Sequence, residues 1–455
     1  MFTNTGPMAQ VTISVGDQSL LLSAQSPVSF GTGGSPAAQL VSVDETVGYQ
    51  ILDGIGGSLT DSSAWVIQND LDAAQRAALL QDLFGAAPGI GLSLLRQPMG
   101  SSDFAVNGNY SYDDVAAGQT DPLLNRFSVA HDAGYIIPML QQALAINPAI
   151  KVMALPWSPP AWMKTSDTMN GGGLDPAYLP SLAQYFVRFL QAYQQSGIDV
   201  YAIAVQNEPL YSTGSYPTAM LDESVEADFI ANELGPALQN NGLGAVKILG
   251  YEHNWDNSAY AESLLSSAAA PFLAGTSFHC YGGDVSAQSA VHAAHPDKDI
   301  WFTECSGTVG SNFAGDLVWN TEKLLIGATR NWARGVSLWN LALDQNSGPT
   351  NGGCTTCRGI VTIDTRTTPA TITRNVEYYA LGQLARFAVP GARRIDSNSF
   401  GSGGIEDVAF QNPDGSIVLL VLNPTLMPQR FSVSWHHTRF DYSLPAQTVA
   451  TFEWP

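Results

Sequence analysis

The spacing of hydrophobic residues divides the chain into three parts. Residues 10–48 alternate apolar and polar positions, and glycines and prolines interrupt the alternation. This pattern predicts short β-strands with one buried face. From about residue 50 to residue 390, apolar strands alternate with amphipathic helical stretches, as β/α units around a parallel sheet do. After residue 392 the helical period stops and alternating strands return.

The middle part contains strand and helix candidates in regular alternation. The strand candidates are residues 51–56, 92–97, 152–157, 202–207, 247–251, 275–279, 300–304 and 335–340. The helix candidates are residues 73–84, 179–195, 227–240, 257–267 and 317–332. Eight such strands predict a (β/α)8 TIM barrel. A doubly wound open sheet is the alternative, but no Gly-x-Gly-x-x-Gly turn follows a strand.

The two chain ends are expected to fold together. C-terminal strand candidates are residues 408–411, 416–422, 431–435 and 449–454. A sheet of a few N-terminal strands is marginally stable alone, so we predict that these strands join the C-terminal strands in one β-sandwich beside the barrel. The predicted fold class is therefore α/β, a TIM barrel with a side β-sandwich built from both chain ends. Its parts are residues 1–48, 49–390 and 391–455.

Composition limits the partners of the protein. The 455 residues include 40 acidic and 19 basic ones, a formal charge of −21 that disfavours nucleic acid and anionic membranes as partners. No apolar run reaches the 18 residues or more that a membrane span needs, so no stable membrane association is expected. The first six residues lack the basic and apolar regions of a signal peptide. Since only 13% of residues are charged, we expect a secreted or extracellular protein whose leader is absent from this sequence.

Four cysteines are present, and two of them form a Cys-x-x-Cys motif, Cys354 and Cys357, in a loop rich in Gly and Thr. No second pair with matching spacing supports a zinc site, and no predicted helix follows as a thioredoxin-like motif requires. We predict a disulfide that closes this loop and leaves Cys280 and Cys305 as free thiols. Free thiols at Cys354 and Cys357 are the alternative. No metal site and no cofactor are expected.

Polar and aromatic side chains follow the predicted barrel strands at their carboxyl ends, where barrel enzymes place their active sites. They are Arg96, Asp103, Trp157, Asn207, Glu208, His279, Tyr281, Glu304 and Trp339. Glu208 and Glu304 each follow an apolar strand, so we expect them to meet across the barrel mouth. Retaining glycoside hydrolysis uses two carboxyl groups about 5–5.5 Å apart, one ionised and one protonated. Repulsion between them raises the pKa of the carboxyl with the poorer hydrogen bonds, and we expect Glu208 to keep its proton in this way.

Other interpretations of these residues are weaker. A glutamate at a strand end can cap a helix or pair with an arginine, but two of them among 10 tryptophans favour catalysis. Trp157 and Trp339 can stack on sugar rings. No second His or Cys at ligand spacing accompanies His279, so we interpret it as a hydrogen-bonding residue. The Gly-x-Ser-x-Gly motif of serine hydrolases is missing.

Six segments together carry a specific resemblance. They are GIGGSLTD at residues 54–61, RQPMGSSDF at 96–104, PWSPPAWMK at 156–164, QNEP at 206–209, TEC at 303–305 and SLWNLAL at 337–343. With these segments the chain resembles glycoside hydrolase family 30, the family of acid β-glucosylceramidase, over nearly its whole length. Asn-Glu-Pro recurs in other retaining barrels, so the segments after strands three and eight narrow the resemblance to this family.

The resemblance implies a role for each matching residue. Glu208 falls on the acid/base, Glu304 on the nucleophile and Asn207 on the residue that binds the substrate 2-hydroxyl. Five residues fall on positions that line the first sugar subsite, namely Arg96, Asp103, Trp157, Tyr281 and Trp339. The implied activity is retaining hydrolysis of β-glucosidic bonds by double displacement, on a β-glucan or another β-glucoside. Residues 344–358 differ from the animal lipid-cleaving enzymes, which disfavours ceramide substrates.

Alternatives remain open at this point. Within the family they are a glucosylceramidase, a β-xylosidase and a β-galactanase. An inverting glycosidase would need carboxyl groups roughly 6.5–9.5 Å apart. A non-catalytic carbohydrate-binding protein would keep the aromatic side chains but could lose a carboxylate, and both carboxylates are present here.

Overall fold

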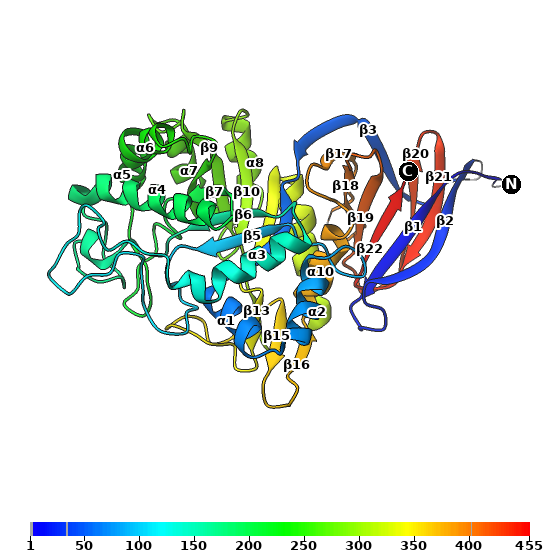
Figure 1. Ribbon diagram of the computed structural model, residues 1–455. Helices are drawn as coiled ribbons and strands as arrows, with labels where there is room; N and C mark the ends of the chain where they lie inside the picture. The colour runs from blue at the N-terminus through cyan, green and yellow to red at the C-terminus, as the bar shows by residue number, and fades with distance from the viewer. Residues whose placement is uncertain (1–2, 33–34, 402) are drawn as a thin grey trace.

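Eight parallel strands close into a barrel, and a β-sandwich lies beside it (Figure 1). The computed structural model describes residues 3–32, 35–401 and 403–455. In pairing order the barrel strands are β10 (Asp299–Glu304), β12 (Ala333–Leu338), β4 (Gly54–Ser58), β5 (Leu94–Pro98), β6 (Lys151–Leu155), β7 (Val200–Ala204), β8 (Lys247–Asn254) and β9 (Leu273–His279). Each overlaps one predicted strand, so the TIM barrel is confirmed.

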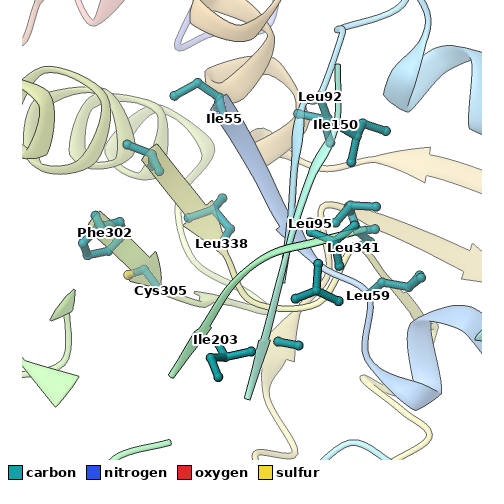
Figure 2. Packing of buried hydrophobic residues seen from close by; sticks show 14 of the residues in the cluster. Ile55, Leu59, Leu92, Leu95, Ile150, Ile203, Phe302, Cys305, Leu338 and Leu341 are labelled. Atoms are coloured by element: carbon teal, nitrogen blue, oxygen red, sulfur yellow. The ribbon is translucent and has the colours of Figure 1, made fainter. Parts of the chain in front are cut away.

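Apolar residues fill both sides of the barrel wall. One face of each strand packs against the surrounding helices, and Figure 2 shows Ile55, Leu95, Phe302 and Leu338 among the buried residues of this cluster. Burying side chains of this kind stabilises the fold by about 1.5–3 kcal/mol each. At Gly56 the neighbouring strand comes so close that an added Cβ would lie 1.7 Å from a backbone oxygen of β5. Only glycine fits there.

Helices surround the barrel. They are α1 (Asp61–Asn69), α2 (Ala73–Phe84), α3 (Ile136–Ile146), α4 (Leu179–Gln195), α5 (Glu223–Phe229), α6 (Gly235–Asn240), α7 (Ser258–Leu265), α8 (Ala287–Ala294), α9 (Phe313–Trp319) and α10 (Val376–Ala385). The boundaries predicted for α2 and α4 are confirmed, and Asp72 caps α2 by accepting from two backbone N–H groups. The other predicted helices contain π-helical turns at Ile230–Leu234 and Asn320–Ala328, or are shorter than predicted. None of the described helices is long and apolar enough to cross a bilayer.

Both chain ends contribute to the sandwich, as predicted. Its strands are β1 (Thr3–Val15), β2 (Ser23–Thr32), β3 (Gln39–Ile51), β17 (Arg393–Ser397), β18 (Glu406–Gln411), β19 (Ile417–Asn423), β20 (Gln429–Trp435), β21 (Thr438–Leu444) and β22 (Thr448–Trp454). The first strand pairs with the last, and β3 pairs with β17 and β20. Strand β2 lies within residues 10–48, which were predicted to form strands. Strands β17 and β21 were not among the predicted strands, because polar residues interrupt their apolar positions. Residues 1–2 and 33–34 of the predicted N-terminal part lie outside the described residues.

Two small sheets are separate from the barrel and the sandwich. One contains β13 (Ala342–Asp344), β15 (Val361–Asp364) and β16 (Thr371–Arg374), and the other pairs β11 (Gly307–Thr308) with β14 (Cys357–Arg358). The predicted Cys354–Cys357 disulfide is present. The prediction of free thiols at Cys280 and Cys305 was wrong, because these two residues are also disulfide-bonded. They directly follow the neighbouring strands β9 and β10, which brings their Cα atoms to 5.4 Å despite 25 residues of separation.

Buried carboxyl groups make the stability of this fold depend on pH. Burial raises the pKa of Glu226 to about 7 and that of Asp132 to about 6, although tyrosine hydroxyls donate hydrogen bonds to both. In the unfolded chain such groups titrate near pH 4. The folded state therefore binds more protons than the unfolded state between about pH 4 and pH 7, and stability falls as the pH rises through this range.

We expect the melting temperature to be higher at pH 5 than at pH 8. Glu226→Gln keeps an acceptor for Tyr260 but removes the proton equilibrium, so it should flatten this dependence by up to about 3 kcal/mol. Calorimetry at both pH values measures the effect. Glu223→Gln, at an exposed position of the same helix, is the matched control. Equal pH dependence in wild type and Glu226→Gln would contradict the role of this carboxyl group.

Candidate active site

A cavity of about 360 Å³ contains most of the residues that the strand-end pattern singled out. It is lined by Asp103, Trp157, Asn207, Glu208, Tyr211, Tyr216, His253, Asn254, Tyr281, Glu304, Trp339, Cys354 and Cys357. These residues come from the carboxyl ends of barrel strands and the loops that follow them. A larger groove of about 700 Å³ lies on the sandwich, away from these strand ends.

The carboxylate of Glu304, the last residue of β10, is fixed by two donors. Arg96 donates from Nη1 to Oε2 over 2.7 Å, and the Tyr281 hydroxyl donates to Oε1 over 2.9 Å. Charge-assisted bonds of this kind are roughly twice as strong as neutral ones. Glu304 thus presents an oriented carboxylate to the cavity.

Arg96 lies beneath the cavity, and its side chain is fully buried. Besides Glu304, its guanidinium contacts Glu252 Oε1 at 2.9 Å from Nη2 and donates to Asn207 Oδ1 over 2.6 Å. Burial lowers the pKa of Arg96, but the charges of Glu304 and Glu252 raise it more, so that its pKa lies above the usual value. One buried cation therefore joins side chains from strands β5, β8 and β10 and from the loop after β7.

Glu208 sits in a strained backbone conformation. Its φ is 47°, in the left-handed region that non-glycine residues rarely adopt, and Glu252 has a φ of 53°. The N–H of Glu208 donates to the carbonyl oxygen of Glu252 over 3.1 Å. Such conformations cost about 1–3 kcal/mol each and cluster at functional sites, where the surrounding structure maintains them.

His279 changes the expected protonation of Glu208. The imidazole is completely buried, with Nδ1 3.2 Å from Glu208 Oε1 and Nε2 3.2 Å from Glu252 Oε1. Burial lowers the pKa of His279, but three carboxylates, those of Glu304, Glu208 and Glu252, raise it to about 9. Burial in turn raises the pKa of Glu208, but His279 lowers it more, to below its usual value. The contact thus shifts the two groups in opposite directions, with the pKa of His279 raised and that of Glu208 lowered.

Asp103 has an unsatisfied carboxyl group. Among the described residues its buried Oδ1 has no hydrogen-bond partner, and burial together with the charges of Glu304 and Glu208 raises its pKa well above the usual value. The loop after β13 packs against it, since Asn351 N donates to the Asp103 carbonyl oxygen over 2.7 Å. A Cβ on Gly353 would lie 2.5 Å from Oδ2, so this loop leaves no room for a larger residue.

The tryptophans line the cavity but are largely covered. Trp157 and Trp339 stack on each other with centroids 4.8 Å apart, and the Arg96 guanidinium lies over both rings. Only 2% and 4% of these residues are exposed, so little of either ring is open to a ligand. Tyr281 and Tyr211 are 48% and 43% exposed and offer more aromatic surface to the cavity.

Most of the residues that the sequence predicted therefore line the cavity, while Arg96 and His279 lie buried beneath it. Sequence reasoning missed Tyr211, Tyr216, Glu252, His253 and Asn254, three of which follow each other at the end of β8. The strand-end criterion would have found these three had it been applied to β8. No second His or Cys at ligand spacing accompanies His279 in the sequence, but the fold brings His253 close to it. Glu208, His253 and His279 offer nitrogen and oxygen atoms that lie within 4.8 Å of one another.

Known proteins are similar to this chain over its whole length. Residues 52–388 match the family model described as the glycosyl hydrolase family 30 TIM-barrel domain, and residues 391–452 match that of the family 30 β-sandwich domain. An endo-1,6-β-D-glucanase of Neurospora crassa is 36% identical over 410 residues, which cover 86% of this chain and 83% of that protein. Putative glucosylceramidase 1 of Caenorhabditis elegans is 29% identical in an alignment that covers 93% of this chain and 85% of that protein. The structure of the endo-β1,6-glucanase BT3312 superposes with a TM-score of 0.90 at 32% identity and covers 99% of both chains.

Removal of the buried cation should destabilise the protein strongly. Arg96→Met leaves Glu252 and Glu304 buried without their guanidinium partner, which should cost about 3–5 kcal/mol of unfolding free energy. Arg366→Met is the matched control, because Arg366 is 73% exposed in its pair with Asp364. Exposed pairs contribute about 1 kcal/mol or less. Urea unfolding compares the two variants, and equal losses would contradict the central role of Arg96.

Proposed function

This chain belongs to glycosyl hydrolase family 30 and is a β-glycoside hydrolase, and we propose that it cleaves β-1,6-glucan with retention of configuration. Glu304 is the nucleophile and Glu208 the general acid/base. The observation that carries this assignment is that two carboxylates with different partners share one cavity. Arg96 and Tyr281 orient Glu304, whereas His279 shares a proton with Glu208.

In the first step, a Glu304 oxygen attacks the anomeric carbon and the bond to the leaving oxygen breaks. The leaving oxygen takes a proton from Glu208. That proton comes from the pair His279 Nδ1 and Glu208 Oε1, which are 3.2 Å apart, so a short transfer converts Glu208 to the acid. The Tyr281 hydroxyl stays close to the attacking carboxylate, where it can limit its movement.

In the second step, water attacks the anomeric carbon of the glycosyl-enzyme. Glu208, now ionised, takes a proton from this water, and Glu304 leaves as a carboxylate. Two inversions at one carbon give net retention. Arg96 stabilises the returning charge on Glu304, since its guanidinium is already oriented toward Oε2.

The substrate assignment rests on similarity and on the cavity wall. The endo-1,6-β-glucanase of Neurospora crassa is more similar to this chain than the putative glucosylceramidase is, at 36% against 29% identity. The unsatisfied carboxyl group of Asp103 is suited to bind an equatorial hydroxyl of a glucosyl unit. A net charge of −21 disfavours docking on anionic membranes. Glucosylceramide is the alternative substrate, because family relatives carry that name.

We further propose that the protein is secreted. Disulfides form and persist in oxidising environments, and all four cysteines are paired. Its partner there is a carbohydrate. Nucleic acid and stable membrane association do not fit the charge of the protein.

Azide rescue tests the two catalytic roles. Glu304→Ala should lose turnover, and azide should then give a glycosyl azide of inverted configuration, because the anion enters from the side of the missing nucleophile. Glu208→Ala should give a glycosyl azide of retained configuration and should lose about 10²–10⁴-fold in rate on a poor leaving group. Nuclear magnetic resonance of the products distinguishes the two anomers. Glu223→Ala, at an exposed position, is the control, and full activity in either active-site variant would refute the assignment.

A substrate panel tests the glucan assignment. We expect kcat/KM on a β-1,6-linked gluco-oligosaccharide to exceed that on glucosylceramide in detergent. An aryl β-glucoside should be preferred over the β-galactoside by at least about 10²-fold, because an axial 4-hydroxyl cannot reach Asp103. Asp103→Ala should reduce this preference. A preference for the lipid would refute the glucan assignment, and a preference for galactoside or xyloside would refute the glucosyl subsite.

A further inference from the structure

We propose that Glu208, His253 and His279 form a binding site for a divalent transition-metal ion, with Zn²⁺ as the best-suited ion, which inhibits the enzyme reversibly. Each residue offers one ligand atom, and these atoms lie within 4.8 Å of one another. Glu208 and His253 line the cavity, so an ion can enter from solvent.

The ligand atoms are close to the spacing that zinc requires. Zinc bound tetrahedrally at about 2.0–2.2 Å from N and O ligands places neighbouring ligand atoms roughly 3.3–3.5 Å apart. His279 Nδ1 is 3.2 Å and His253 Nδ1 is 3.9 Å from Glu208 Oε1. The three ligand atoms all lie within 4.8 Å of one another, so His253 has to move toward the other two ligands to complete the set.

His253 has a nitrogen that is available for this purpose. Its Nδ1 is buried and makes no hydrogen bond with any of the described residues. An unsatisfied buried polar atom costs about 1–3 kcal/mol. A metal ion between His253 and Glu208 would remove this cost.

His279 is oriented as metal-binding histidines are. Its second ring nitrogen, Nε2, lies 3.2 Å from Glu252 Oε1, and Ser277 and Arg96 hold the Glu252 carboxylate in turn. A carboxylate behind the ring fixes the tautomer and increases the affinity of the other nitrogen for metal. The ion takes the place of the proton between His279 Nδ1 and Glu208 Oε1, and that proton leaves to solvent.

The chemistry of the three ligands selects the ion. Two imidazoles and one carboxylate suit Zn²⁺, Cu²⁺ or Ni²⁺, whereas Mg²⁺ prefers a shell of six oxygen atoms. Coordination occupies the Glu208 oxygen that shares the proton, so the residue can no longer protonate the leaving group. The inhibition therefore rests on the proposed role of Glu208, but the binding of the ion does not.

Calorimetric titration of chelator-treated protein with ZnCl₂ tests the binding. We expect a zinc site that His253→Ala weakens at least about tenfold. His436→Ala is the matched control, because it removes a histidine that pairs with Glu45 on the sandwich, and it should bind as the wild type does. MgCl₂ should not bind at this site. Equal zinc affinity in wild type and His253→Ala overturns the proposal. If circular dichroism shows that His253→Ala is unfolded, His253→Gln provides the same comparison.

Hydrolysis of an aryl β-glucoside tests the inhibition. Zinc should inhibit the wild type, chelation should restore the rate, and His253→Ala should need at least about tenfold more zinc for the same inhibition. Zinc binding that depends on His253 but leaves hydrolysis unchanged overturns the inhibition. A zinc-free wild type that hydrolyses no glycoside would refute the proposed function, while the binding comparison would still decide the metal site.

Discussion

The buried guanidinium of Arg96 is the interaction on which the site depends. A charge without water must be paired, and here Glu304, Glu252 and Asn207 surround it. These partners come from strands β10 and β8 and from the loop after β7, so the ion pairs also fix how the strand ends meet. The strained backbone of Glu208 is compatible with this arrangement because its N–H donates to Glu252, which Arg96 holds in place.

A line of alternating charges runs from Arg96 through Glu252 and His279 to Glu208. Glu252 lies between Arg96 and His279, and Glu208 lies beside His279. The position of one proton determines the charges of His279 and Glu208. The pKa of about 9 at His279 and of about 2 at Glu252 follow from these contacts. The position at which we propose proton transfer in catalysis is also the proposed metal site, because both require an oxygen and an imidazole nitrogen at close distance.

Contacts at the end of the barrel opposite to the cavity, and contacts between the barrel and the sandwich, support the structure around this site. Asp53, completely buried, accepts hydrogen bonds from Trp301 inside the barrel and from Arg334 at its end. Arg330 reaches from the barrel to the sandwich, where it donates to Ser397 O over 2.7 Å. The loop with the Cys354–Cys357 disulfide forms one wall of the cavity beside Asp103. A barrel can change its substrate by variation in such a loop, while the residues beneath the cavity stay the same.

The sequence determined the elements of this fold, because the hydrophobic period is a local property that each segment carries with it. The eight barrel strands, helices such as α2 and α4, and the strand-end position of Glu208 and Glu304 could all be predicted on this basis. The family resemblance added the roles that we propose for the two glutamates.

Only the tertiary structure decided which side chains meet. The Cys280–Cys305 disulfide, the placement of His253 and Glu252 beside Glu208, and the covering of Trp157 by Trp339 depend on barrel closure, which brings together residues far apart in the chain. The directions of the pKa shifts at His279 and Glu208 were also beyond the sequence, since the pKa of a buried group depends on the charges around it and not on its neighbours in the chain.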